Sequence, residues 1–420
     1  MKRAANWDWE TSEKRIDIAP WNESFEWVEE YHASPDGESI AAIVNTGEES
    51  FGICVNGETW PTTFEKAWNL QFCPDGRLMA LVCLDGQWTV GVDRQVWESR
   101  FDYVWSPSFS ADGSVIGIAF QEGMQYGMAV NDTPWEDRFA NMTDVALSPD
   151  GRHSAATVQT DALSEGDIFT FKKGVFTAAV DGKPWDRPFV NVWGNTFDAG
   201  GETLAAEVRL DRFRYSIAVN GVIWQETFGS VWQPRFAPGS NRVSAPVLTK
   251  QGWTLAEDGK PLWDSRFVQC WHHQYSPTSD DIAAIVAPEF GKWTVARNGA
   301  AWRQRASSML TDMVFSPDGR RIAALAKDDD QWTVLVDDQR WENRFDRIWP
   351  PVLSPDSRHV MAKVQKNNHY TVAIDDHCWS NRCDMLWPPS FNPEGDKVLI
   401  RSVENGAYYR RVLPLADLLH

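Results

Sequence analysis

Histidine, cysteine and carboxylate side chains are the groups in this sequence that could support catalysis or hold a metal. His272 and His273 form the only histidine pair, and adjacent residues of a strand point to opposite faces, which makes them a poor chelate. The adjacent pair His377-Cys378 is a poor chelate for the same reason. The sequence has no G-x-S-x-G nucleophile elbow, no glycine-rich phosphate loop and no H-E-x-x-H motif. We therefore expect no catalytic residues, no cofactor and no metal site.

A tryptophan recurs along the chain at a nearly constant interval. The intervals are 37 to 39 residues, apart from one of 50. A fixed period of this length is typical of repeat architectures. We call these tryptophans the anchors, and they are Trp21, Trp60, Trp97, Trp135, Trp185, Trp224, Trp263, Trp302, Trp341 and Trp379.

Each repeat keeps the same internal order after its anchor. A phenylalanine such as Phe64 follows four residues later, and a turn of the Ser-Pro-Asp-Gly kind, as at residues 34–37, precedes an apolar run. A dipeptide such as Asn56-Gly57 then leads to the next anchor, and Asn-Gly is what a type I′ hairpin turn requires. These turns separate runs rich in β-branched and aromatic residues, which predicts four strands per repeat.

Ten repeats of four antiparallel strands predict an all-β fold. We expect one domain over residues 1–420, a single β-propeller of about ten four-stranded blades. The last repeat lacks its closing strand. An N-terminal strand near residues 21–27 is expected to complete that blade and close the ring, which would leave no free sheet edge. Two rings of five blades are the alternative, although no Pro/Gly/Ser-rich linker divides the chain.

One repeat, from Trp135 to Trp185, is longer than the others. Its extra residues fall near 159–173, between the expected second and third strands. Insertions in repeats map to one face of the molecule, which is often the binding face. A neutral surface loop is the alternative, because loops tolerate added length at little cost.

A second tryptophan follows seven of the anchors by eight residues. The anchors themselves are explained by packing between blades, since large aromatic rings bury much area. The second set falls where the outer strand of one blade leads to the inner strand of the next, near one rim of the expected channel. We treat these residues as candidate partner contacts, with packing as the alternative. They are Trp68, Trp105, Trp193, Trp232, Trp271, Trp349 and Trp387.

The charge balance and the first residues bound the class of partner and the compartment. The formal net charge of −19 disfavours nucleic acid and anionic membrane surfaces, which require basic patches. No run is long and apolar enough to span a membrane, and residues 1–20 lack the apolar core of a secretion signal. The six scattered cysteines fit buried thiols in a reducing compartment better than disulfides. We expect a cytoplasmic protein.

The repeat motifs resemble those of known proteins. The turn-and-strand sequences SPDGESIAA (34–42) and SPDGRRIAA (316–324) are similar to WD40-like propeller repeats of the TolB type. The 420-residue length, the 24 tryptophans and the lack of cofactor motifs resemble the tryptophan-rich D subunit of the Tmc transmembrane redox complex of sulfate-reducing bacteria. That resemblance implies a subunit without cofactors, and partners that are cytochrome b, iron–sulfur and multihaem cytochrome subunits.

Three functions are therefore open at the level of sequence. The first is a non-catalytic scaffold for protein–protein interaction, a cofactor-free cytoplasmic accessory subunit, peripheral to the inner membrane, of a membrane-bound electron-transfer complex. The second is a propeller glycosidase or hydrolase that uses carboxylates at the channel mouth. The third is a propeller that binds a peptide or a small ligand. We expect the first and expect no enzyme activity.

Overall fold

The computed structural model describes residues 4–161, 163 and 166–419. Nearly all regular elements are strands, and they form ten antiparallel sheets. Each sheet contains four strand positions, and in three sheets the first strand is split into two short pieces. This result confirms the prediction of an all-β propeller with ten four-stranded blades. The blades divide between two compact units, and the prediction of one domain stays a prediction.

The second unit, Glu65–His273, contains five complete blades. Its strands are β6 (Lys66–Phe72), β7 (Leu78–Leu84), β8 (Gln87–Val92), β9 (Gln95–Val96), β10 (Tyr103–Phe109), β11 (Ile116–Glu122), β12 (Gln125–Val130), β13 (Thr133–Pro134), β14 (Met142–Leu147), β15 (Ser154–Gln159), β16 (Phe176–Val180), β17 (Lys183–Pro184), β18 (Asn191–Phe197), β19 (Leu204–Arg209), β20 (Tyr215–Val219), β21 (Val222–Ile223), β22 (Ser230–Val231), β23 (Arg235–Phe236), β24 (Val243–Thr249), β25 (Gly252–Glu257) and β26 (Lys260–Pro261). The chain leaves this unit within β27 (Gln269–Tyr275).

The first unit combines Met1–Phe64 with Gln274–His420. Its strands are β1 (Glu13–Asp17), β2 (Val28–Ala33), β3 (Ile40–Gly47), β4 (Ser50–Val55), β5 (Glu58–Thr59), β28 (Ile282–Glu289), β29 (Lys292–Arg297), β30 (Ala300–Ala301), β31 (Met309–Phe315), β32 (Ile322–Asp328), β33 (Gln331–Val336), β34 (Gln339–Arg340), β35 (Arg347–Ile348), β36 (Val352–Leu353), β37 (Val360–Lys366), β38 (His369–Ile374), β39 (His377–Cys378), β40 (Met385–Leu386), β41 (Ser390–Phe391), β42 (Lys397–Glu404) and β43 (Ala407–Pro414). The short helices are η1 (Ala4–Asn6), α1 (Trp21–Ser24) and η2 (Leu415–Leu418) here, and α2 (Ile168–Lys173) in the other unit. None of the described helices has the length and apolar character needed to cross a membrane.

The predicted turns form as the sequence requires. Asn56 and Gly57 have φ values of 51° and 93°, the double left-handed geometry of a type I′ turn. The side-chain oxygen of Asn56 also accepts the backbone N–H of Ile40 at 2.9 Å. The turn residue therefore fixes the hairpin of β4 and β5 and also ties it to the start of β3.

The cores lie between neighbouring blades. The second strand of a blade, such as β15, is buried along almost its whole length, because blades pack on both of its faces. Met79 and Leu81 of β7 pack with Phe101, Ile116 and Phe120 in one such core. Six anchors are buried, which confirms the packing role predicted for them, and these are Trp21, Trp60, Trp135, Trp224, Trp263 and Trp341.

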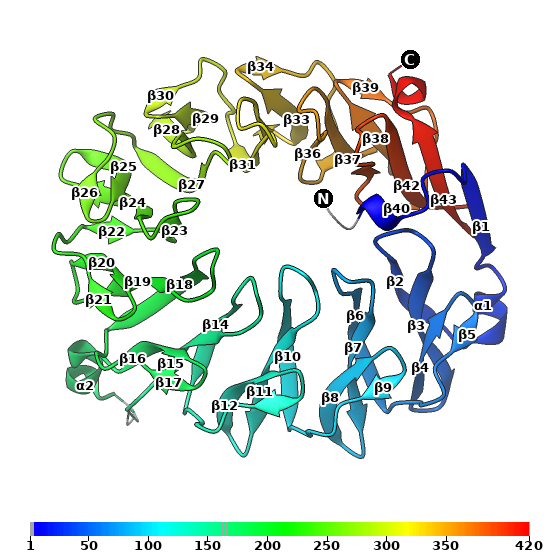
Figure 1. Cartoon of the computed structure of the whole chain (residues 1–420), viewed down its shortest axis with the longest axis horizontal. Coiled ribbons are helices and arrows are strands. Elements are labelled where there is room, and N and C mark those ends of the chain that lie inside the picture. Colours follow the sequence, from blue (N-terminus) through cyan, green and yellow to red (C-terminus); the bar gives the residue numbers. More distant parts are fainter. Residues whose placement is uncertain (1–3, 162, 164–165, 420) are drawn as a thin grey trace. The chain divides into compact units, whose positions relative to one another are not determined.

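An N-terminal strand completes the last blade, as predicted, but it is β1 and not residues 21–27. β1 pairs antiparallel with β43, with Glu13 opposite Arg411 and Asp17 opposite Ala407, and Figure 1 shows the blue strand beside the red one. Trp21 begins helix α1 and is buried like other anchors. The predicted strand was placed too far along the chain. Trp21 follows the closing strand, just as other anchors follow the outer strand of their blade.

Two buried arginines join this closing blade to the blade of β2–β5. Arg401 donates to the carbonyl of Ser34 at 2.8 Å, and Arg410 donates from Nε to the carbonyl of Asp36 at 3.0 Å. Gly37, directly after Asp36, has φ +76°, and a Cβ there would lie 2.9 Å from Cγ of Arg410. Glycine is therefore required both by the turn and by the close approach of the arginine.

The predicted insertion lies between the second and third strands of its blade, β15 and β16, as expected. It contains helix α2, which begins after Asp167, whose carboxylate accepts the backbone N–H of Thr170 at 3.0 Å. Residues 162 and 164–165 of the insertion lie outside the described residues.

Candidate functional site

The seven predicted contact tryptophans lie in the first strands of their blades or directly after the first segment of a split strand. Trp193 and Trp232 are the exposed members, at 39% and 45%. The other five, Trp68, Trp105, Trp271, Trp349 and Trp387, are half-buried. The sequence pattern therefore finds one structural position that is occupied in seven blades, and its surface exposure differs from blade to blade.

Two of these tryptophans belong to one aromatic cluster in the second unit. The ring of Tyr103 stacks on Trp68 with centroids 6.1 Å apart and on Trp105 at 6.0 Å. Trp88 and Tyr126 extend the cluster by edge contacts. Such pairs stabilise packing beyond their buried area. Packing thus accounts for Trp68 and Trp105, although Tyr103 between them is exposed.

Trp232 differs because it presents a supported flat surface. Its ring stacks on the buried ring of Trp253 at 5.7 Å with an angle of 11° between the planes. An exposed ring that is held in one orientation loses little conformational freedom when a partner binds. The sequence missed a further exposed tryptophan, Trp27, which contacts the edge of Phe51 at 5.8 Å.

The backbone changes direction directly after each of these tryptophans. Asn69, Ser106, Gly194 and His272 follow four of them and have φ between +49° and +65°. In three of these blades the first strand shows a register shift at this point, as a β-bulge produces. In the three split strands a proline follows within two residues, at Pro234, Pro350 and Pro388.

The residue opposite each tryptophan on the second strand varies in charge. Trp68 faces Leu81 and Trp105 faces Ala119. Trp193, in contrast, faces Glu207. Directly opposite residues in an antiparallel pair place their side chains on the same face, so the carboxyl of Glu207 lies on the face of the sheet that carries Trp193.

A lysine occupies the corresponding position in the blade of β35–β39. Trp349 donates its backbone N–H to the carbonyl of Lys363 at 3.0 Å. The ammonium nitrogen of Lys363 lies 4.1 Å from the ring centroid of Trp349 and 4.8 Å from that of Tyr370, which is cation–π geometry. Burial lowers the pKa of Lys363 to about 8.

Glu207 lies beside a second acidic group, Asp144 of β14. Asp144 has φ +53°, and its carboxylate accepts the backbone N–H of Asn195 at 2.8 Å and that of Gly194. Asn195 donates from Nδ2 to the carbonyl of Asp144 at 2.8 Å and to Thr157 at 3.0 Å. These bonds join the blades of β14–β17 and β18–β21. We call Asp144, Asn195 and Glu207 the acidic cluster.

Electrostatics in the acidic cluster favour protonation. Burial and the nearby charge of Asp144 raise the pKa of Glu207 to about 8. Burial also raises the pKa of Asp144, although two backbone amides oppose that shift. A carboxylic acid with a pKa near neutrality can take up or release a proton near pH 7, and its carboxylate form can bind a cation. Within the described residues, no group of three or more metal-binding side chains was found.

His273 is a buried structural residue and does not form a site with His272. Its Nε2 lies 2.9 Å from the Oγ of Ser244, and burial together with the nearby charge of Arg235 lowers its pKa to about 3. The histidine is therefore neutral throughout the physiological pH range. The six cysteines are free thiols, and five of them are buried, as predicted.

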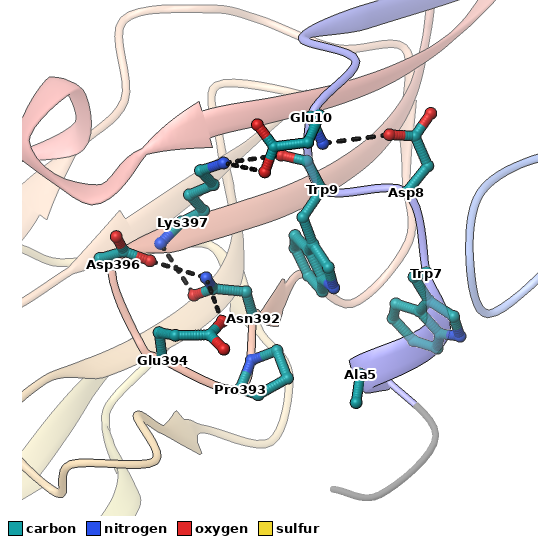
Figure 2. A pocket seen from close by; sticks show the side chains of 10 residues that line it. All are labelled: Ala5, Trp7, Asp8, Trp9, Glu10, Asn392, Pro393, Glu394, Asp396 and Lys397. Atoms are coloured by element: carbon teal, nitrogen blue, oxygen red, sulfur yellow. Dashed lines mark hydrogen bonds and ion pairs between the residues drawn. The ribbon is translucent and has the colours of Figure 1, made fainter.

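A pocket of about 510 Å³ lies between the N-terminal segment and the closing blade of the first unit. Figure 2 shows the rings of Trp7 and Trp9 on one side of it and Asn392, Pro393 and Glu394 on the other. The two indoles stack with centroids 5.9 Å apart. Lys397 donates to the carbonyl of Trp9 at 2.9 Å and pairs with Glu10, so these contacts hold the N-terminal segment on the blade.

Sequence reasoning missed the acidic cluster because its members come from different strands. The available signal was the run LAAEVR (204–209), in which Glu207 interrupts a strand that is apolar in most other repeats. The sequence feature that could have indicated the pocket is the W-x-W motif of Trp7 and Trp9, which precedes the first anchor.

Comparisons with known proteins show no family match. No family model matches the sequence, and no curated protein matches it. Among solved structures, the chain is similar to a "eukaryotic initiation factor", with 13% identity, 75% of this chain and 87% of that chain covered, and a TM-score of 0.46. It is also similar to the "Dos1 propeller" (11%, 64% and 92%, 0.34) and to a putative TolB from Agrobacterium tumefaciens (12%, 52% and 87%, 0.31). The ten sheets, and not these similarities, define the fold.

Proposed function

We propose that the protein is a non-catalytic scaffold that binds other proteins through exposed aromatic side chains on its first strands. The observation that carries this proposal is the exposure of Trp193 and Trp232 at one repeated position of the fold. Tryptophan and tyrosine are enriched among the residues that dominate the binding energy of protein interfaces. The stacked support of Trp232 by Trp253 adds a rigid, pre-formed contact surface.

We further propose that the partners are subunits of a membrane-bound electron-transfer complex, and that the chain acts on its cytoplasmic side without a cofactor. Support for this finer proposal comes from the repeat pattern and tryptophan content, which resemble those of the tryptophan-rich Tmc subunit. The net charge of −19 favours partners with basic surfaces, because complementary charge accelerates association.

Affinity capture from the native host, with this chain as bait, tests the proposal. We expect haem-containing and iron–sulfur subunits to be recovered in a fixed ratio to the bait. The double variant Trp193→Ala/Trp232→Ala should reduce their recovery at least about tenfold, as loss of two interface tryptophans does. Phe290→Ala is the control, because Phe290 is also an exposed aromatic residue but lies outside the proposed surface. Equal recovery with all three baits would contradict the proposal.

A second candidate function is acid–base hydrolysis, and the acidic cluster is the observation that favours it. A protonated Glu207 next to Asp144 has the chemistry of a general acid paired with a carboxylate. Hydrolysis of aryl glycosides by the purified chain, abolished in Glu207→Gln, would support this function. Activity that is absent, or unchanged in that variant, excludes Glu207 as its catalytic acid.

A further inference from the structure

The blades of β18–β21 and β35–β39 carry opposite charges at the same structural position. In the latter, the ammonium group of Lys363 already lies on the ring of Trp349, 4.1 Å from its centroid. In the former, Glu207 occupies the position of the lysine, opposite Trp193. The position next to the tryptophan thus accommodates an ammonium group in one blade, whereas the other blade offers a carboxyl group and an exposed ring.

The acidic cluster has more acceptors than donors. Glu207 is only 9% exposed, and the described residues provide neither a hydrogen-bond donor nor an ion-pair partner for its carboxyl. The Oδ1 atom of Asn195 is also buried, and no described residue donates a hydrogen bond to it. Buried polar groups without partners are rare in folded proteins, and each one indicates an unassigned donor, water or ion. The Oδ1 atom of Asn195 is such an atom, and together with the carboxyl of Glu207 it indicates a ligand that donates hydrogen bonds.

The carboxyl of Glu207 lies close to the backbone of Gly194. A Cβ placed on Gly194 would lie 3.0 Å from Oε1 of Glu207 and 3.2 Å from Cγ of Gln233. Any larger residue at position 194 would therefore crowd the carboxyl. The charged neighbour of Glu207 is Asp144, from β14, and Gln233 contributes no charge. Among the residues that the structure describes, none supplies a cation that neutralises this carboxyl.

We propose that Trp193, Glu207 and Asp144 form a binding site for an ammonium group, and that in the cell this group is a lysine side chain of a protein partner. The assignment of the lysine to a partner rests on the scaffold function proposed above. The ring of Trp193 supplies the cation–π contact, and the two carboxyl groups supply the charge. When the ammonium group enters, Glu207 releases its proton to solvent and the carboxylate pairs with the ammonium, so that charge is conserved.

The site can be tested with n-butylammonium chloride, which reproduces the end of a lysine side chain. Carbon-13 NMR of glutamate carboxyl groups follows the titration of Glu207, whose resonance is the one missing in Glu207→Gln. We expect saturating n-butylammonium to lower the pKa of Glu207 by about one pH unit or more, relative to sodium chloride at equal ionic strength. A shift of this size corresponds to a tenfold lower affinity of the carboxylate for its proton. No difference between the two salts would overturn the site.

Two single variants separate this site from the general scaffold function. Trp193→Ala should abolish the response to n-butylammonium, whereas Trp27→Ala should leave it intact, because Trp27 is also an exposed tryptophan but packs against Phe51 in another blade. An equal response in both variants would contradict the role of Trp193. If the double tryptophan variant recovers fewer partners but the pKa of Glu207 does not respond to n-butylammonium, the scaffold function is supported and the ammonium site is refuted. If the pKa of Glu207 responds but the double tryptophan variant recovers the same partners as the parent, the ammonium site is supported and the proposed scaffold surface is refuted.

Discussion

Arg401 donates a hydrogen bond from Nη1 to the backbone carbonyl of Ser34 at 2.8 Å, although 367 residues separate the two in the sequence. Its second terminal nitrogen donates to the carbonyl of Pro388 at 2.6 Å. One buried guanidinium therefore connects the closing blade to the turn that follows β2.

Replacement of this arginine should destabilise the first unit. Arg401→Met keeps most of the side-chain volume but removes the guanidinium donors to the carbonyls of Pro388 and Ser34. The Ser34 carbonyl still accepts the backbone N–H of Gly37 at 2.9 Å, and we expect a loss of about 1–3 kcal/mol in the free energy of unfolding. Urea denaturation followed by tryptophan fluorescence measures it. Arg303→Met is the matched control, since the side chain of Arg303 is 91% exposed, and it should change stability by less than about 0.5 kcal/mol. Similar losses in both variants would refute the role of Arg401.

The closing strand should protect β43 from solvent exchange. Ile16→Pro introduces a residue without a backbone N–H in the middle of β1, where Ile16 pairs with Tyr408, and proline removes a ladder hydrogen bond. We expect faster hydrogen exchange at amides of β43, measured by mass spectrometry, and unchanged exchange in β7 of the other unit. If β43 exchanges at the parental rate, β1 contributes little to closure of the blade.

Glu207 should make stability fall as the pH rises. Its pKa is raised from 4.5 to about 8 in the folded protein, so the folded state holds a proton that the unfolded state has released. The stabilisation is complete below pH 4.5 and is lost as the pH rises toward 8. Glu207→Gln should be more stable than the parent at pH 8 by about 1.4 kcal/mol or more, with the difference shrinking below pH 5. A constant difference across this range in thermal denaturation would contradict the shift.

His273 should act in the opposite direction, at acid pH. Its pKa is lowered from 6.5 to about 3, so the unfolded chain binds a proton that the folded protein excludes. Stability should decrease as the pH falls below 6.5, and His273→Gln should lose less stability than the parent between pH 6.5 and pH 4. The exposed His369 provides the control, and His369→Gln should follow the parental profile. An unchanged profile for His273→Gln would show that the buried imidazole does not control acid stability.

The repeat sequence predicted the blades because each of its signals is local. Asn56-Gly57 requires left-handed backbone wherever it occurs, and the φ values confirm it. The closing strand was misplaced by several residues because nothing local separates Arg15 from Trp21 in strand preference. β1 is fixed by its pairing with β43, nearly 400 residues away.

The acidic cluster could not be predicted for the same reason. Asp144 and Glu207 belong to strands of neighbouring blades, and only the packing of β14 against β18 brings them together. The tryptophan position was predicted from its spacing, but its exposure was not. Exposure depends on neighbouring rings, such as Tyr103 beside Trp68, which do not follow the repeat.

The register of the closing strand also determines how the chain responds to mechanical tension. Glu13 pairs with Arg411 and Asp17 with Ala407, so the N-terminal end of β1 and the C-terminal part of β43 lie at the same end of the ladder. A force that separates the two ends of the chain would open these hydrogen bonds one after another, like a zipper, and would not load them together in shear. Tension between the two termini would therefore release the closing strand at a lower force than a shear geometry would require, while the buried second strands of the other blades stay in place.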